Sequence, residues 1–137
     1  MDTTIERDNS CFCCGLENER GFHLEFTYPV AGEAESRLVV PEWCAGWKGV
    51  THGGFVTMLL DEIMAHACTA FAASAVTADI SVRFLKPVPT GSTIRIVGRT
   101  DSTRGRILAT KGWIYSAEGE AMAEATAKFI VTGRHAL

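Results

Sequence analysis

The sequence has no apolar run approaching the roughly 20 residues that a transmembrane helix needs. It also lacks the apolar amino-terminal segment of a signal peptide, since it begins MDTTIERDNS. Basic residues are not in excess either: 13 Lys and Arg stand against 16 Asp and Glu, for a net charge of −3. That balance argues against a nucleic-acid-binding face. These absences predict a cytoplasmic protein that binds neither membranes nor nucleic acid.

Internal repeats, linkers and low-complexity tracts are missing as well, and 137 residues are enough for one core. We therefore expect a single domain over residues 1–137, of which residues 1–20 form a polar lead and a turn-rich opening. The 5 cysteines are odd in number and stand in a chain without an export signal. We interpret them as reduced thiols.

The hydrophobic pattern predicts one long helix and several strands. Residues 55–73 contain neither glycine nor proline and are rich in Leu, Met and Ala, which favours a helix that starts near Gly53 and Gly54. Residues 43–54 are interpreted as a loop. Alternating apolar and polar residues predict a hairpin followed by an antiparallel meander, with strands at 23–30, 33–41, 75–88, 92–100, 106–116 and 121–133. Because a helix that is apolar on most sides must be covered, we expect an α+β fold in which a curved antiparallel sheet of five to six strands wraps it.

Two carboxylates, Asp61 and Glu62, lie inside that apolar helix. At about 100° per residue, Glu62 joins His66 on a narrow polar stripe, which we interpret as solvated. Asp61 instead falls among small residues, in a groove that a ligand or another backbone can approach; these residues are Gly54, Ala65, Cys68 and Ala72.

Cys11 and Cys14 have the spacing of a metal-binding pair, with Cys13 between them. A structural zinc ion needs two further ligands, and no second pair with such spacing follows. We therefore predict no metal site and interpret the three cysteines as small apolar residues that pack a turn.

These features resemble the hotdog-fold acyl-CoA thioesterases, in particular the phenylacetate-pathway (PaaI-like) branch. His-Gly-Gly at 52–54 opens the helix, Asp61 follows His52 by nine positions, and the strand VTADISVRFLKPV comes next. The opening CFCCGLENERGFHL resembles the pattern C-F-x-C-G-x-x-N-x-x-G-L-x-L, with Phe22 in place of the first Leu. The resemblance runs from about Cys11 to Val131. It implies a hotdog fold assembled as a homodimer or a dimer of dimers (a homotetramer), with active sites at the subunit interface.

The resemblance also implies roles for single residues. Asp61 is the general base or nucleophile, and the Gly53 N–H donates to the thioester carbonyl. His52 helps to shape that pocket, and Thr77 holds the attacking water or the acid. The glycine segment and the acid of one site are expected from different subunits. Many relatives carry an Asn or Gln shortly before the glycines, whereas residues 44–47 here read CAGW.

The chemistry of thioester hydrolysis suits the same residues. A helix start offers unpaired N–H groups with partial positive charge, and paired glycines let a carbonyl approach them. A carboxylate in an apolar groove has a raised pKa and is a better base. Coenzyme A also brings phosphates that basic side chains should receive. The candidate substrate-binding residues are Gly54, Arg83, Lys86, Arg104 and Arg106.

The sequence thus predicts hydrolysis of an acyl- or aryl-acyl-CoA to free acid and coenzyme A, with no metal or cofactor beyond the coenzyme A of the substrate. Two alternatives stay open. One is a hotdog hydratase or dehydratase that pairs His52 with Asp61. The other is a non-catalytic acyl-CoA-binding protein, which the missing amide before the glycines favours.

Overall fold

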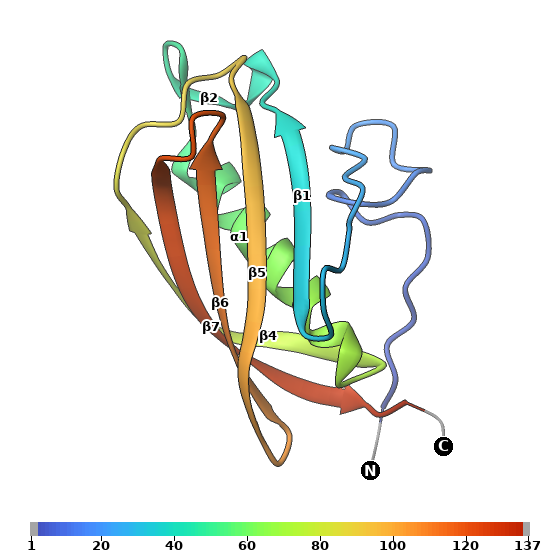
Figure 1. Cartoon of the computed structure of the whole chain (residues 1–137). Coiled ribbons are helices and arrows are strands. Elements are labelled where there is room, and N and C mark those ends of the chain that lie inside the picture. Colours follow the sequence, from blue (N-terminus) through green and yellow to red (C-terminus); the bar gives the residue numbers. More distant parts are fainter. Residues whose placement is uncertain (1–2, 136–137) are drawn as a thin grey trace.

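The computed structural model describes residues 3–135, and it shows one helix lying against a five-stranded antiparallel sheet (Figure 1). The predicted domain spans residues 1–137, of which 1–2 and 136–137 lie outside the described residues. In their order across the sheet, the strands are β1 (Glu33–Val39), β5 (Thr93–Arg104), β6 (Ile107–Ser116), β7 (Ala121–Gly133) and β4 (Ser74–Phe84). The helix is α1 (Gly53–Ala67). The predicted α+β fold is confirmed.

Short elements occupy the segment predicted as a loop. Strands β2 (Ala45–Trp47) and β3 (Val50–Thr51) pair as a small second sheet directly before α1. Two 3-10 turns are also present, η1 (Glu42–Cys44) and η2 (Cys68–Ala70).

The pairing of the last four strands differs from the predicted meander in one point. Strands β5, β6 and β7 are consecutive neighbours, as predicted, but β4 pairs with β7 rather than with β5. The connection from β4 to β5 therefore crosses from one side of the sheet to the other, and β4 becomes an edge strand.

Residues 23–30 do not form the predicted strand. A single bridge joins Thr27 to Glu35, and His23 has a φ of 52°, which interrupts an extended chain. The segment lies along α1 instead: Leu24 is buried in the core, and the Phe26 ring stacks on His66 with 3.6 Å between ring centroids. Its alternation of apolar and polar residues reflects packing against the helix.

The helix starts at the glycine pair, as predicted, but it ends at Ala67 rather than near residue 73. The Thr100 hydroxyl donates to the Ala67 carbonyl at 2.9 Å, and the Thr69 hydroxyl donates to the His66 carbonyl at 2.8 Å. These side chains take up carbonyl groups that a continuing helix would use. Within residues 3–135, no helix is long and apolar enough to cross a membrane.

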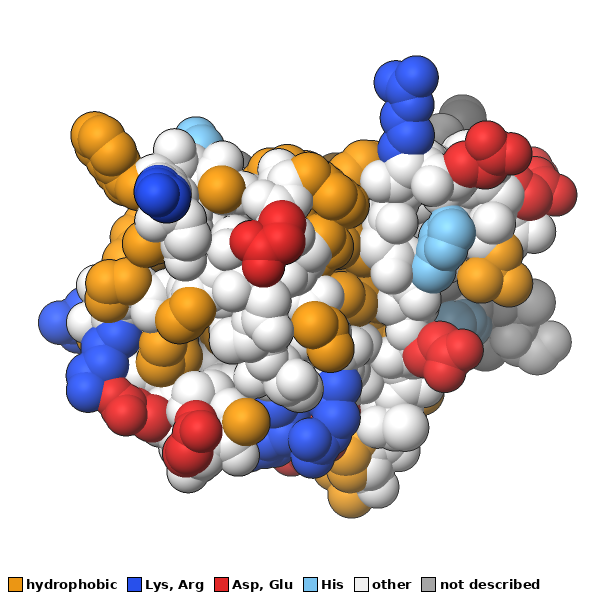
Figure 2. All heavy atoms as spheres, turned by 90° about the horizontal axis from the view of Figure 1, so that it is seen from above, with side chains coloured by type: hydrophobic (Ala, Val, Ile, Leu, Met, Phe, Trp, Pro, Cys, Tyr) orange, Lys and Arg blue, Asp and Glu red, His pale blue; other side chains and the backbone are white. Residues whose placement is uncertain are grey.

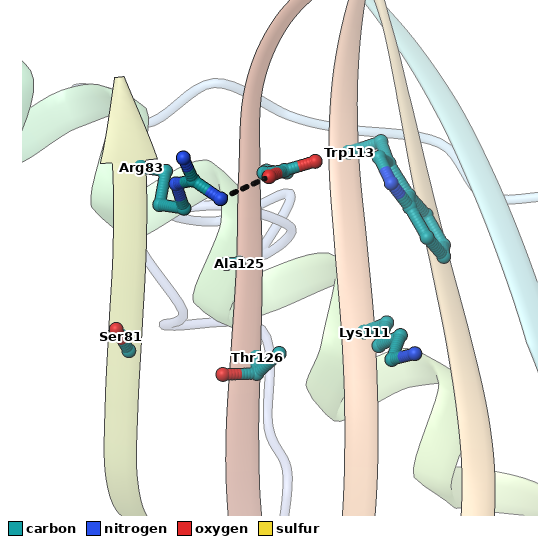
Figure 3. A pocket seen from close by; sticks show the side chains of 7 residues that line it. Ser81, Arg83, Lys111, Trp113, Ala125 and Thr126 are labelled. Carbon is teal, nitrogen blue, oxygen red and sulfur yellow. Dashed lines mark ion pairs between the residues drawn. The ribbon is translucent and has the colours of Figure 1, made fainter. Parts of the chain in front are cut away.

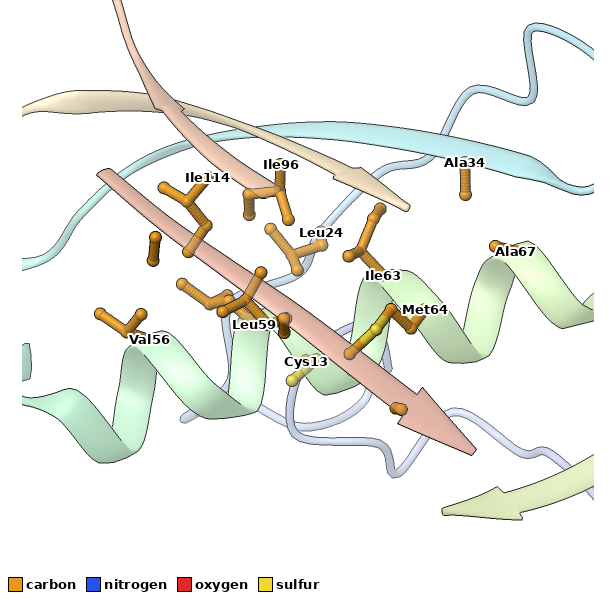
Figure 4. Close-up of a cluster of buried hydrophobic side chains, with 14 of the residues drawn as sticks. Cys13, Leu24, Ala34, Val56, Leu59, Ile63, Met64, Ala67, Ile96 and Ile114 are labelled. Atoms are coloured by element: carbon orange, nitrogen blue, oxygen red, sulfur yellow. The ribbon is translucent and has the colours of Figure 1, made fainter. Parts of the chain in front are cut away.

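Two glycines let α1 lie close to the sheet. A Cβ on Gly98 of β5 would come within 2.6 Å of the Ile63 carbonyl oxygen, and one on Gly112 of β6 within 3.1 Å of Met64 Cγ. Around this contact, apolar side chains of the helix and the strands form the core (Figure 4); they include Val56, Leu59, Ile63, Met64, Ile96 and Ile114. The core thus fixes the helix that carries the candidate site.

We expect Gly98→Ala to destabilise the fold by about 1–3 kcal/mol, because backbone atoms of the helix cannot move aside for the new methyl group. Gly112→Ala is the matched control, since its methyl group would meet the flexible Met64 side chain. Urea unfolding of both variants checks this. Equal losses of stability in the two variants would contradict the proposed backbone clash.

Candidate active site

The start of α1 leaves one backbone donor without a partner. His52 is the N-cap: its Nδ1 accepts the Gly54 N–H at 2.8 Å, and its carbonyl accepts the N–H groups of Phe55 and Val56. No acceptor among residues 3–135 takes the Gly53 N–H. This group, together with the partial positive charge of the helix start, is available to a ligand.

Glycines make room for the His52 ring and for an approaching ligand. A Cβ on Gly54 would lie 3.0 Å from His52 Nδ1, and one on Gly46 would lie 3.1 Å from His52 Cα. At Gly53 a Cβ would meet the ring of Phe84 at 3.3 Å. His52 therefore shapes the helix start through contacts within its own chain.

A hollow of about 410 Å³ lies at Gly53. Its lining is mostly apolar and includes Trp47, whose residue surface is 83% exposed, and Phe84. Lys86 also lines it and forms an ion pair with Glu120. Figure 2 looks onto this end of the molecule and shows hydrophobic side chains gathered between isolated charged ones. An apolar hollow of this size with one free N–H suits the body and carbonyl of a small ligand.

Asp61 lies half-buried on α1 and accepts a hydrogen bond from the Thr77 hydroxyl, with 2.6 Å between Oγ1 and Oδ1. Burial raises the pKa of the Asp61 carboxyl, the Thr77 hydrogen bond lowers it, and the neighbouring charge of Glu62 raises it; the net effect is a raised pKa. A carboxylate with a raised pKa is a stronger base once ionised.

A bulge in β4 turns Thr77 toward the helix. The register shifts between Thr77, which pairs with Phe129, and Asp79, which pairs with Lys128. Thr77 therefore faces Asp61 while Ile80 and Val82 also pack against the core. Strict alternation of side chains along residues 75–88 predicts Thr77 on the face opposite Ile80 and Val82. The bulge makes that prediction wrong, because its extra residue reverses the alternation.

Gly53 and Asp61 of one chain do not meet. They are eight positions apart on the same helix, which puts them roughly 12 Å apart along its axis. One carbonyl group cannot contact both. A single chain thus forms both the helix start at Gly53 and the Asp61–Thr77 pair, but it does not bring them to the same place.

The family model described as thioesterase superfamily matches residues 48–123, a span that includes Gly53, Asp61 and Thr77. The chain belongs to the thioesterase superfamily. It is 28% identical over 130 residues to the acyl-coenzyme A thioesterase THEM4 of Xenopus laevis, a match that covers 90% of this chain and 57% of that protein. The chain thus spans little more than half the length of this curated relative.

Solved structures show the same fold. A Streptococcus mutans protein solved with acetyl-CoA bound has a TM-score of 0.78 at 24% identity, covering 88% of this chain and 98% of that one. The PaaI protein from the phenylacetic acid degradation operon of E. coli has a TM-score of 0.76 at 19% identity, covering 82% of each chain. The predicted hotdog fold is confirmed, and the resemblance to the PaaI-like thioesterases is confirmed at the level of the fold.

The basic residues singled out in this thioesterase-superfamily chain lie in separate places. Lys86 lines the hollow at Gly53. Arg83 lies on the sheet face turned away from α1, beside Lys111 and Trp113 in a hollow of about 320 Å³ (Figure 3), and it pairs with Glu124 at 3.5 Å.

Arg104 and Arg106 flank the tip of the β5–β6 hairpin, at the opposite end of the sheet from the helix start (Figure 1). The Arg106 guanidinium donates to the Val131 carbonyl at 2.9 Å. Among the predicted basic residues, Lys86 is thus the one that the fold brings to the glycine pair of its own chain.

Glu62 and His66 do not form a solvated stripe, so that prediction is wrong. Their side chains are only 14% and 8% exposed, and His66 Nε2 lies 3.0 Å from Glu62 Oε1. The Tyr28 hydroxyl lies 2.9 Å from His66 Nδ1, and Phe26 stacks on the ring. The amino-terminal segment covers this side of the helix, which helical periodicity alone cannot show.

Proposed function

We propose that this chain hydrolyses acyl-CoA thioesters to free acids and coenzyme A, with no metal or further cofactor in the reaction. The observation that carries the proposal is the unpartnered Gly53 N–H at a helix start that opens on an apolar hollow. The named activity of the THEM4 relative and the acetyl-CoA bound to the Streptococcus mutans protein support coenzyme A thioesters as the substrate class.

In the proposed reaction the Gly53 N–H donates to the thioester carbonyl oxygen and stabilises the negative charge that builds there. Asp61 takes a proton from the attacking water, or attacks the carbonyl itself to form an anhydride that water cleaves. Thr77 binds Oδ1 of Asp61 and thereby orients the carboxylate, so that Oδ2 can face the water.

The proposed site is shared between two copies of the chain. Within one copy, Gly53 and Asp61 are too far apart along α1 to contact one carbonyl. Strand β4, which carries Thr77, is an edge strand with Val76 and Phe84 40% and 58% exposed. A second copy seated along β4 covers this apolar edge and brings its glycine pair to Asp61.

The direct test is release of coenzyme A from a panel of acyl-CoA and aryl-acyl-CoA substrates, followed with a thiol-detecting reagent. We expect turnover, and the preferred acyl group identifies the substrate. Tight binding in calorimetry without release of coenzyme A would identify a binding protein instead. In the hydratase alternative His52 would act through Nε2, because its Nδ1 accepts the Gly54 N–H; a change in the absorbance of an enoyl-CoA on mixing with the protein would identify that activity.

Sharing of the site predicts complementation between two impaired variants. We expect Asp61→Asn and Gly53→Pro, a substitution that removes the Gly53 N–H, each to retain no more than about one hundredth of the wild-type rate alone. Random mixing should restore roughly a quarter of the sites, because half of the dimers are mixed and each mixed dimer has one intact site. Activity after co-refolding of the two variants checks this. No recovery in verified mixed dimers would contradict a shared site while leaving the hydrolase assignment to the substrate panel.

Replacement of Thr77 by Val should move the acidic limb of the pH–rate profile to higher pH. The hydrogen bond from Thr77 lowers the pKa of Asp61, so its loss leaves the raising effect of burial less opposed. Asp61 then ionises, and becomes a base, only at higher pH. Thr77→Ser keeps the hydroxyl and is the matched control. An unshifted kcat/KM profile in Thr77→Val would show that this hydrogen bond does not tune the base.

A further inference from the structure

Cys11 and Cys14 have the spacing of a metal-binding pair, but the sequence shows no further ligand beside them. In the folded chain the carboxylate of Glu62 lies next to both sulfurs. Cys11 Sγ lies 3.7 Å from Glu62 Oε1, although the two residues are 51 positions apart. The two sulfurs of Cys11 and Cys14 and a carboxylate oxygen of Glu62 all lie within 4.8 Å of one another. Each of the three residues is partly buried. This set of side chains plays no part in the proposed hydrolysis.

The turn that carries the two cysteines is built to present sulfur atoms. The Cys14 N–H points at Cys11 Sγ with 3.4 Å between N and S, and the Gly15 N–H donates to the Cys11 carbonyl at 2.8 Å. A Cβ on Gly15 would come within 2.3 Å of the Asn9 carbonyl oxygen, so the turn needs glycine there. The backbone N–H directed at Cys11 Sγ fixes the position of that sulfur beside the second thiol.

We propose that Cys11, Cys14 and Glu62 bind a Zn²⁺ ion that joins the amino-terminal segment to helix α1. In a tetrahedral site, with Zn–S near 2.3 Å and Zn–O near 2.1 Å, sulfur and oxygen ligands stand roughly 3.6 Å apart. The separation of 3.7 Å between Cys11 Sγ and Glu62 Oε1 matches this. On binding, each thiol releases its proton to solvent and its sulfur forms a bond to the metal.

The surroundings of these ligands suit a zinc ion as well. Two thiolates and a carboxylate around Zn²⁺ leave a net charge of −1, and the Arg7 guanidinium lies 3.7 Å from Cys14 Sγ, where it offsets that charge. His66 Nε2 lies 3.0 Å from Glu62 Oε1 and 2.7 Å from the Arg7 guanidinium, and the Tyr28 hydroxyl lies 2.9 Å from Nδ1, so a cluster of polar groups surrounds the carboxylate.

Glu62 supplies one of the two ligands that a structural zinc ion needs beyond the cysteine pair, and a water molecule takes the remaining coordination position. A cavity of about 210 Å³ adjoins the ligands and is lined by Arg7, Cys11 and Glu62 together with residues 73–76. The zinc ion would act as a structural clamp. Glu62 follows Asp61 on the helix but points about 100° away from it. The clamp therefore fixes the part of α1 that carries the base without contacting the substrate.

The test measures metal content rather than activity. The full chain is expressed with added zinc, purified under reducing conditions and analysed by mass spectrometry for zinc per chain. We expect about one zinc per chain in the wild type and a loss of tenfold or more in Cys11→Ala and Cys14→Ala. Cys13→Ala is the matched control. Cys13 lies between the two ligands but is buried in the core, so this variant should keep its zinc.

Cobalt titration of the reduced, metal-free wild type tests the site without any substitution. Binding of Co²⁺ should produce sulfur-to-cobalt charge-transfer absorption that zinc then abolishes. A wild type with neither bound zinc nor this absorption would overturn the proposal, as would equal loss of zinc in Cys13→Ala. A Cys11–Cys14 disulfide that persists under reduction, seen as a mass lower by two hydrogens, would also overturn it. Substrate turnover is scored separately, so failure here leaves the proposed hydrolysis intact.

Discussion

Asp61→Asn is expected to lower kcat for acyl-CoA hydrolysis by roughly 10²–10⁴-fold, the usual contribution of a positioned general base. The amide keeps the shape of the carboxylate and still accepts the hydrogen bond of Thr77 at Oδ1. It can neither take a proton from water nor attack the carbonyl. The loss should therefore appear in kcat, with little change in substrate binding.

The same substitution should leave the fold at neutral pH as stable as before or more stable. Burial raises the pKa of Asp61 above its ordinary value of 3.8, so the folded chain holds this proton more tightly than the unfolded chain. The contribution of Asp61 to the free energy of unfolding is therefore lost as pH rises from about 3.8 through the raised pKa. Asparagine carries no charge, so the variant avoids the cost of a half-buried ionised carboxylate at neutral pH. Thermal unfolding at neutral pH measures the resulting gain in stability.

Glu19→Gln is the matched control for Asp61→Asn. Glu19 is an exposed acid of the amino-terminal segment, away from β4 and the helix start, and has no part in the proposed site. We expect this variant to keep the wild-type rate. If Asp61→Asn also keeps the wild-type rate, Asp61 is neither the base nor the nucleophile.

Gly53→Pro is expected to lower kcat by roughly 10²–10³-fold, the effect of removing one oxyanion donor. Proline lacks the N–H, yet it is well tolerated at the first position of a helix, which Gly53 occupies. The preceding residue, His52, already has the extended backbone that proline requires, with φ −58° and ψ 134°. The substitution therefore removes the donor with little other change in the helix start.

Gly53→Ala separates the loss of the N–H from the effect of added bulk. Its methyl group would lie 3.3 Å from the Phe84 ring, which is part of a residue 58% exposed and can shift by a few tenths of an ångström. Because alanine keeps the N–H, we expect a clearly smaller loss of rate than in Gly53→Pro, limited to the effect of the methyl group on the approaching ligand. Equal losses in the two variants, with intact circular dichroism, would assign the effect to bulk and contradict the oxyanion role.

Much of the fold could be predicted from local patterns in the sequence. The absence of glycine and proline after Gly54 predicted the helix, and alternation predicted β5, β6 and β7. The helix end was missed because Thr100, which caps the Ala67 carbonyl, comes from β5. The strand predicted at 23–30 failed because alternation does not distinguish packing against a helix from pairing in a sheet.

The candidate site was predictable in part. The glycine pair and Asp61 could be found in the sequence, because a helix start and a carboxylate inside an apolar helix are local features. The hydrogen bond between Thr77 and Asp61 depends on a bulge, which alternation does not show. The placement of Lys86 beside Gly53, and of Arg104 and Arg106 far from it, depends on strand order.

The sequence by itself determined the elements and the chemical groups of this protein: one helix opened by glycines, an acid within it, and a cysteine pair. Backbone preferences and hydrophobic periodicity act over a few residues, so they can be seen in the order of amino acids. Only the tertiary structure decided which groups meet, as when Cys11 reaches Glu62 across 51 positions of chain. Such contacts arise because the core buries α1 between the sheet and the amino-terminal segment, and burial depends on the whole chain at once.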